Sequence, residues 1–315
     1  MNPKIVLRWM SLALLATVVA ACSSGESSSP VNAPADANKT PADAVSAWAV
    51  LMKKGDIDGM LRTSLPAADY QKVRQAYADS QFKTQAVSAE DKAKFAAQMK
   101  KLTAPDAEQK IFEEIKPALE QFNTKYKAQL PMYVGMGQTM AATAIDKSKT
   151  MSAQEKQQTK DVLQALAQWV QTTNWGDQDK AKQAIAIVCD TARKLDIQTL
   201  DQARALSYEQ AMQKYSQAWN ALKQVVAIYG LDIDKTLDSV EAKTVSSADG
   251  KATVAYSYSI FDKPMQGEIA LVERDGHWYN PKFIQQMEKS LAEQAAATAA
   301  AGSAAAPATA TSAAK

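Results

Sequence analysis

Histidine and cysteine, which supply many of the nucleophiles, proton carriers and metal ligands of enzymes, are nearly absent from this sequence. Its 315 residues include one histidine, His277, and two cysteines, Cys22 and Cys189. General acid–base catalysis most often uses histidine, but His277 follows the turn signal Asp275-Gly276, where an exposed polar side chain is expected. Since no motif joins His277 to Cys189, the sequence identifies no catalytic residue and predicts that the protein is not an enzyme.

Motifs for metals and cofactors are also missing. No His/Cys/Asp cluster has the spacing of metal ligands, and Asp232-Ile233-Asp234 lacks the later ligands of a calcium loop. No glycine-rich phosphate loop and no Gly-x-Ser-x-Gly elbow occurs. We therefore expect no metal and no cofactor.

Neither sign of charge is in large excess, since 36 Lys and Arg oppose 34 Asp and Glu. Residues 1–21 contain two of the basic residues, Lys4 and Arg8, and no acid, so that 36 minus 2 leaves 34 bases against 34 acids. A neutral balance with both signs interspersed gives no overall attraction to nucleic acid or to an anionic membrane. We expect no nucleic-acid partner.

The apolar run that follows Lys4 and Arg8 extends only from about Trp9 to Val19. Such a run is too short to cross a bilayer core of roughly 30 Å as a helix. A basic start, a short apolar segment and small residues before a cleavage point are the parts of a secretion signal. Residues 1–21 are therefore predicted to be a signal peptide.

Val19-Ala20-Ala21-Cys22 resembles the bacterial lipobox, in which an aliphatic residue and two small residues precede a cysteine that receives diacylglycerol. The resemblance implies a lipoprotein acylated at Cys22, so that one partner is the membrane itself. Ordinary signal cleavage, which would leave Cys22 as a free thiol, is the alternative. By resemblance to lipoprotein sorting signals, Ser23 favours the outer membrane of a Gram-negative bacterium, facing the periplasm.

Composition divides the rest of the chain into three parts. Residues 22–39, rich in Ser, Pro and Ala, are predicted to be a lipidated flexible tether. Residues 40–294 are predicted to fold, and the Ala-rich residues 295–315 are predicted to be disordered. Within the folded part we expect helices over 40–230, an antiparallel sheet over 236–280 and a closing helix over 281–293.

Helix-start signals recur along the helical part. Thr40-Pro41-Ala42-Asp43 offers a capping hydroxyl, a proline in the first turn and an acid that suits the helix dipole. Ser88, Ser152 and Ser207 begin similar signals. Helices are predicted near 41–53, 56–64, 67–83, 89–102, 106–146 with breaks at Pro117 and Pro131, 153–173, 178–194 and 200–229.

Two apolar patterns stand out within these helices. An aromatic stripe at alternating four- and three-residue steps is predicted to be core, with the lining of a ligand groove as the alternative. A methionine and glycine patch after Pro131 is predicted to fill a loose helix joint, with contact to a partner or lipid as the alternative. The stripe consists of Tyr208, Met212, Tyr215, Trp219, Leu222, Val226 and Tyr229, and the patch of Met132, Gly135, Met136, Gly137 and Met140.

After Gly230 the period changes to two. Val254, Tyr256, Tyr258 and Ile260 alternate with Ala and Ser, which predicts a strand with one apolar face. Asp249-Gly250 and Asp275-Gly276 are hairpin signals. The chain is therefore predicted to be an α+β protein: a mostly helical body with a carboxy-terminal antiparallel meander of three to four strands.

The opening Thr40-Pro41-Ala42-Asp43-Ala44-Val45, then Lys54-Gly55-Asp56-Ile57, and the closing stretch from Val272 to Tyr279 resemble a known family. They are similar to small bacterial lipoprotein domains with the cone-shaped fold of nuclear transport factor and SnoaL-like proteins. The resemblance implies opening helices packed on a curved sheet, with roughly residues 66–230 as a helical insertion. The acid–base residues that enzymes of this fold carry inside the cone are not found in this sequence.

In such a fold Trp48, on the opening helix, would cover the strand face that carries Tyr256 and Tyr258. Tyrosine hydroxyls in an apolar space need polar partners. We therefore predict a small pocket between Trp48, Tyr256 and Tyr258, with an ordinary core as the alternative.

Two functions fit these observations. The first is a membrane-anchored periplasmic lipoprotein that acts as a non-enzymatic binding or accessory module for an envelope protein or a small apolar ligand. The alternative is an inhibitor or immunity lipoprotein that neutralises a toxic cell-wall enzyme. The sequence does not identify the partner.

Overall fold

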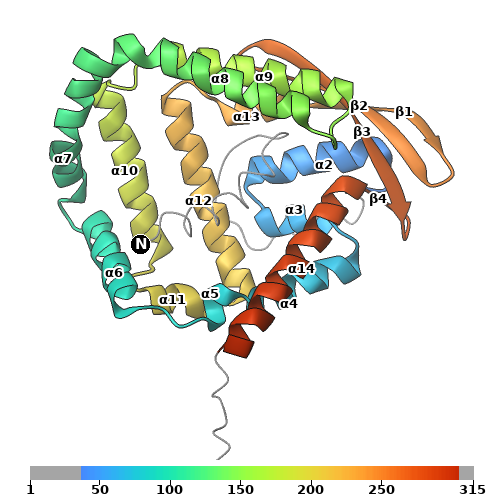
Figure 1. Ribbon diagram of the computed structural model, residues 1–315, viewed down its shortest axis with the longest axis horizontal. Coiled ribbons are helices and arrows are strands. Elements are labelled where there is room, and N and C mark those ends of the chain that lie inside the picture. Colours follow the sequence, from blue (N-terminus) through green and yellow to red (C-terminus); the bar gives the residue numbers. More distant parts are fainter. Residues whose placement is uncertain (1–36, 305–315) are drawn as a thin grey trace, which may run out of the picture.

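The computed structural model describes residues 37–304. It confirms the predicted fold class: a mostly helical body is followed by a four-stranded antiparallel sheet and one last helix (Figure 1). The predicted signal peptide, Cys22 and residues 305–315 lie outside the described residues. Within residues 37–304, no helix is both long enough and apolar enough to cross a membrane.

Residues 37–39, predicted to belong to the tether, are part of the folded body. Ala37 and Asn38 are buried. The Asn38 side-chain amide donates to the Thr63 carbonyl at 3.0 Å, and the Trp278 backbone N–H donates to the Asn38 carbonyl, also at 3.0 Å. These bonds tie the start of the described chain to a helix and to a strand, so the fold begins before residue 40.

The first helix begins and ends at the predicted signals. The Thr40 hydroxyl accepts a hydrogen bond from the Asp43 N–H at 3.2 Å, and Pro41 lies in the first turn. Gly55, at φ 68°, ends this helix in the left-handed conformation. The segment predicted as one helix over 67–83 forms two. These elements are α2 (Pro41–Lys54), α3 (Ile57–Ser64), α4 (Ala67–Ala78) and α5 (Gln81–Thr84).

The two prolines of the next segment behave differently. Pro131 lies in the first turn of a helix, where its missing N–H would have no helical partner. Pro117 does not break its helix, contrary to the prediction. Both Pro117 and Glu113, whose carbonyl loses its usual donor, are exposed, so water can satisfy that carbonyl. The segment contains α6 (Ala89–Thr103), α7 (Ala107–Gln121), the π-helical η1 (Phe122–Tyr126), the 3₁₀-helical η2 (Lys127–Gln129) and α8 (Leu130–Lys147).

Capping boxes begin the helices after Ser152 and Ser207, where the sequence predicted helix starts. In each, the serine hydroxyl accepts a hydrogen bond from the backbone N–H of the residue three positions later. The side chain of that later residue in turn accepts a hydrogen bond from the serine N–H. A short helix after Asp232 was not predicted. The helices are α9 (Ala153–Thr172), α10 (Gln178–Leu195), α11 (Leu200–Ala205), α12 (Tyr208–Ile228) and α13 (Ile233–Asp238).

The sheet is a simple meander, with strand order β1-β2-β3-β4. Asp249-Gly250 and Asp275-Gly276 make the predicted turns, with positive φ at both positions of each. A third turn, Phe261-Asp262, was not predicted; its φ angles are 53° and 61°, which is unusual for a bulky residue such as phenylalanine. The strands are β1 (Glu241–Ala248), β2 (Lys251–Ile260), β3 (Lys263–Arg274) and β4 (His277–Tyr279).

The closing helix, α14 (Pro281–Ala304), continues past residue 293, its predicted end. Residues 295–304 were expected to be disordered because they lack apolar periodicity. They are helical here, and alanine, the strongest helix former, dominates them.

One face of the sheet forms the core between strands and helices. Val45 of α2 and Val162 and Ala165 of α9 pack on this face, so that helices from distant parts of the chain cover it together. The residues that β2 contributes are Ala252, Val254, Tyr256, Tyr258 and Ile260, all buried.

The aromatic stripe of α12 is core only in part. Tyr208 and Met212 are buried, but Tyr215 and Leu222 are 50% and 49% exposed. The helix contacts α3, α4, α10 and α13, and these neighbours leave part of the stripe uncovered. The prediction of a continuous core face was therefore wrong at Tyr215 and Leu222.

Candidate functional site

An apolar cavity lies between α7 and α10, at the end of the molecule away from the strands (Figure 1). Ile111, Ile115 and Leu119 recur at four-residue steps, so they share one face of α7. The facing positions of α10 follow the three- and four-residue spacing of one helix face. They are Ala181, Ala184, Ile185, Val188 and Cys189.

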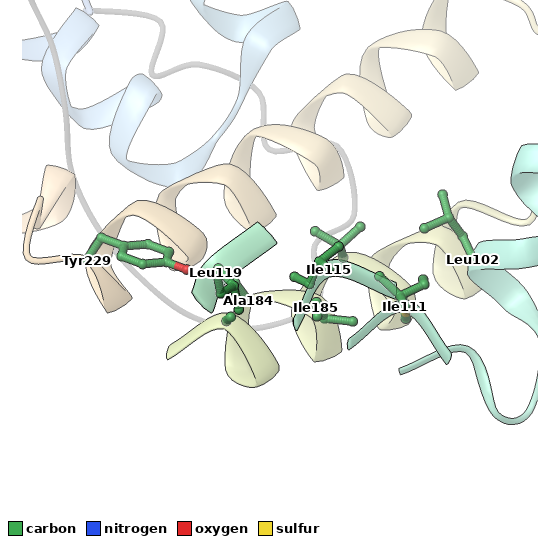
Figure 2. A pocket seen from close by; sticks show the side chains of 10 residues that line it. Leu102, Ile111, Ile115, Leu119, Ala184, Ile185 and Tyr229 are labelled. Carbon is green, nitrogen blue, oxygen red and sulfur yellow. The ribbon is translucent and has the colours of Figure 1, made fainter. Parts of the chain in front are cut away.

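The cleft has a volume of about 200 Å³. Figure 2 shows Leu102 of α6 at one end, Tyr229 at the other, and the isoleucines between them. The floor of the cleft is well packed, because Ile185 and Cys189 are buried against Ala107 at the start of α7. Val188, by contrast, is 43% exposed, so the cleft is open to solvent on one side.

An ion pair holds the two walls together at the Leu102 end. Both terminal guanidinium nitrogens of Arg193, in the last turn of α10, donate to the Glu108 carboxylate at 2.6 and 2.9 Å. One of them also donates to the Ala104 carbonyl at 2.9 Å. The hydrogen bonds from Arg193 lower the pKa of Glu108 to about 2. The bidentate pair therefore fixes the position of α10 against the corner between α6 and α7.

An aromatic row closes the opposite end. The Tyr229 ring stacks on Trp175 with centroids 5.0 Å apart. Trp175 contacts Trp169 edge-on at 5.2 Å, and Trp169 stacks on Phe261 of the β2–β3 turn at 5.9 Å. The Trp169 indole N–H donates to the Tyr229 carbonyl at 2.8 Å. Tyr229 is therefore held by contacts that continue to the sheet.

The chemistry of the cleft is that of apolar binding. None of its ten lining residues carries a charge, and the tyrosine hydroxyl is the strongest polar group among them. Cys189 is 0% exposed, and burial raises the pKa of its thiol, which disfavours the nucleophilic thiolate. The site can exclude water around an apolar group, and it contains no ionised side chain for acid–base catalysis.

The structure places the predicted pocket residues in two adjoining clusters. Tyr256 and Tyr258 are buried beneath α9, and their rings stack with centroids 6.3 Å apart. The Tyr256 hydroxyl donates to the Gln158 side-chain oxygen at 2.9 Å. Trp48 is half-buried beside Leu237 and Met52. The hydroxyl of Tyr256 thus has a protein partner in α9, and the pocket between the three residues stays a prediction.

Tyr256 also lines a second hollow, which has a volume of about 420 Å³. This hollow is lined by residues of β1, β2 and β3 and by the first turn of α9. This hollow differs from the first because Glu241, Lys243 and Glu268 contribute charged side chains. Trp48 lines neither of the two hollows.

His277 lies at the start of β4, where its Nδ1 is 3.0 Å from the Asp275 carbonyl. It is half-buried, rather than exposed as expected. Among the residues that the structure describes, no group of three or more His, Cys, Asp and Glu side chains is arranged to hold a metal ion.

Comparison of the chain with protein-family models, with curated proteins and with solved structures finds no match.

Proposed function

We propose that this protein is a lipoprotein of the cell envelope, anchored through Cys22 to the outer membrane and facing the periplasm, that acts as a non-enzymatic binding module. Its ligand-binding site is the cleft between α7 and α10. The observation that supports this function is the lining itself, which consists of ten uncharged residues in an open cavity of about 200 Å³.

The volume and lining indicate the class of ligand. In other proteins, a dry apolar cavity of about 150 Å³ lined by Leu, Ile and Phe is large enough to bind benzene. The cleft therefore fits a short alkyl chain, a single ring, or one apolar side chain of a partner protein. Because Val188 is exposed, the rest of a larger ligand can extend into solvent.

The inhibitor or immunity function would use the same anchor, but it requires no apolar cavity. The cleft therefore favours the binding module over the inhibitor.

The cleft is tested with N-phenyl-1-naphthylamine, a neutral apolar fluorophore. Ala184→Phe places a ring in the cleft and should weaken binding of the fluorophore about tenfold or more, because the space it would occupy is filled. Ala186→Phe is the matched control, since Ala186 is exposed on the same helix and does not line the cleft. Equal binding by both variants and the parent protein would exclude the cleft as the site.

The anchor is tested separately by mass spectrometry of the envelope fraction. We expect the mature amino terminus to be Cys22 with diacylglycerol, and Cys22→Ser to leave the chain unprocessed or released in soluble form. An unmodified amino terminus in the unaltered protein would exclude the lipoprotein assignment.

A further inference from the structure

Helix α8 carries no charged residue between Lys127, which precedes it, and Asp146 in its last turn. Its 18 residues make it about 27 Å long. The helix packs on α9 along one side only, and none of its residues is fully buried. The described chain therefore presents a long uncharged helix face to its surroundings.

Three methionines form the centre of that face. Met132, Met136 and Met140 lie at four-residue steps and are 61%, 55% and 69% exposed, and Tyr133 beside them is 50% exposed. The predicted loose helix joint is not observed, because the patch lies on a regular helix and points outward. Exposed large apolar groups in a contiguous row usually mark an interaction site.

The polar groups of the face are already satisfied by the helix. The Thr139 hydroxyl donates to the Gly135 carbonyl at 2.9 Å, and the Thr143 hydroxyl donates to the Thr139 carbonyl at 2.8 Å. Both threonines therefore bond back to the preceding turn, as such residues do in apolar surroundings. Removing the face from water would therefore leave these hydroxyls with their hydrogen-bond partners and would cost little free energy.

Basic residues bracket the uncharged run. Lys125 and Lys127 precede it, Lys147 and Lys149 follow it, and all four are exposed. The one acid among them, Asp146, is paired with Lys160 at 2.5 Å. Although the mature chain is neutral overall, this edge of the molecule has a local excess of positive charge at both ends of an apolar face.

We propose that the methionine face of α8 docks on a lipid surface that contains anionic headgroups. Methionine and tyrosine side chains would enter the boundary between headgroups and acyl chains, and the four lysines would contact the headgroup phosphates, as in other interfacial helices. Lipid fits better than a second copy of the chain, because the two lysine pairs of antiparallel copies would face each other.

The proposal is strengthened by the lipid anchor and to that extent rests on the proposed function. Residues 22–36 can span at most about 50 Å when fully extended. An anchored molecule of this size would therefore stay close to the bilayer, where even a weak surface affinity acts at high local concentration.

Vesicle flotation tests the docking without the anchor. The protein is the mature chain from residue 22 with Cys22→Ser, which retains every residue that the structure describes. We expect it to bind vesicles of phosphatidylethanolamine and phosphatidylglycerol. Met140→Glu should lower the partition coefficient about tenfold or more, because a charge enters the apolar face. Val245→Glu is the matched control, since Val245 is 59% exposed on β1.

A second variant separates the charge from the apolar contact. Replacing Lys125, Lys127, Lys147 and Lys149 with glutamine should weaken binding to phosphatidylglycerol vesicles and leave binding to pure phosphatidylcholine vesicles unchanged. The proposal is overturned if the parent chain does not bind, if Val245→Glu weakens binding equally, or if sedimentation shows a dimer that Met140→Glu dissociates. None of these outcomes depends on Cys22, so they are distinct from failure of the anchor.

Discussion

The region around the sheet and the helical arm are packed differently. The sheet region comprises residues 37–84 and 206–304, and the helical arm comprises residues 88–205. Large side chains fill the sheet region, among them Leu65, Tyr208, Trp278 and Ile284. In the arm, by contrast, most of the buried apolar positions are alanine, and α6 and α8 contain no buried residue.

The difference in packing indicates that one region provides most of the stability and the other provides the binding surfaces. Free energy of burial grows with the apolar area removed from water, so the sheet region should contribute most of the stability of the fold. Sparse burial is typical of segments that open locally at low cost. Both proposed binding surfaces, the α7–α10 cleft and the methionine face of α8, lie in the arm, apart from Tyr229 at one end of the cleft. We infer that the sheet region is the scaffold on which the arm is mounted.

The largest expected effect compares one isoleucine in each region. Ile284→Ala removes a side chain that is 2% exposed and should lower the free energy of unfolding by about 3–5 kcal/mol. Ile185→Ala, at the edge of an existing cleft, should cost about 2 kcal/mol because less new cavity is made. Denaturant unfolding measures both. Equal costs would remove the distinction between the two regions.

Trp219→Ala should have the next largest effect. Trp219 is half-buried, and its indole N–H donates to the Met52 carbonyl at 3.1 Å near the end of α2. We expect a loss of about 2–3 kcal/mol, below the cost for a fully buried aromatic residue. Trp219→Phe keeps most of the packing and should lose only about 1 kcal/mol. If both variants lose the same amount, the hydrogen bond and not the packing is responsible.

Tyr256→Phe should loosen the attachment of the arm to the sheet. It removes the hydroxyl that donates to Gln158 of α9 and leaves a buried amide oxygen without this donor, at a cost of about 1–2 kcal/mol. Amide hydrogen exchange should quicken in α9 more than in β2. Tyr133→Phe, at an exposed position, is the control and should change neither quantity. Unchanged exchange in α9 would show that other contacts hold the arm in place.

The smallest expected effect concerns the pair that clamps the cleft. The pKa of Glu108 is lowered to about 2 in the folded protein by Arg193, against roughly 4.3 for an unperturbed glutamate. The stabilisation from this shift is complete above about pH 4.3 and is lost as the pH falls towards 2. Arg193→Gln should therefore make stability less dependent on pH in this window. Exposure of both side chains keeps the effect small.

A double mutant supplies the control for that prediction. Glu108→Gln should flatten the same part of the curve, and combining it with Arg193→Gln should add little, because one interaction is removed in both cases. An additive result would mean that the two residues act independently.

Local signals in the sequence predicted the fold well. The serine caps, the Asp-Gly turns and the change of period after Gly230 each depend on neighbouring residues, and each is found in the structure. The Phe261-Asp262 turn was not predictable in this way, since a bulky residue such as phenylalanine rarely adopts positive φ. Its phenylalanine stacks on Trp169, a contact that only the folded chain makes.

The candidate site was harder to predict from the sequence than the fold. Ile111, Ile115 and Leu119 have the spacing of an ordinary core face, and nothing in that spacing shows that α10 leaves a gap opposite them. The tyrosines of β2 were assigned to a pocket under α2, but α9, from the distant arm, supplies the partner of Tyr256. Both features depend on contacts between segments far apart in the sequence.

The aromatic row from Phe261 to Tyr229 has an optical consequence. Two indole rings 5.2 Å apart, Trp169 and Trp175, interact electronically and should give the protein a strong exciton signal in its circular dichroism spectrum. Tyr229 both lines the cleft and stacks on Trp175. A ligand that shifts the Tyr229 ring would therefore change the spectrum, and occupancy of the cleft could be followed without any added label.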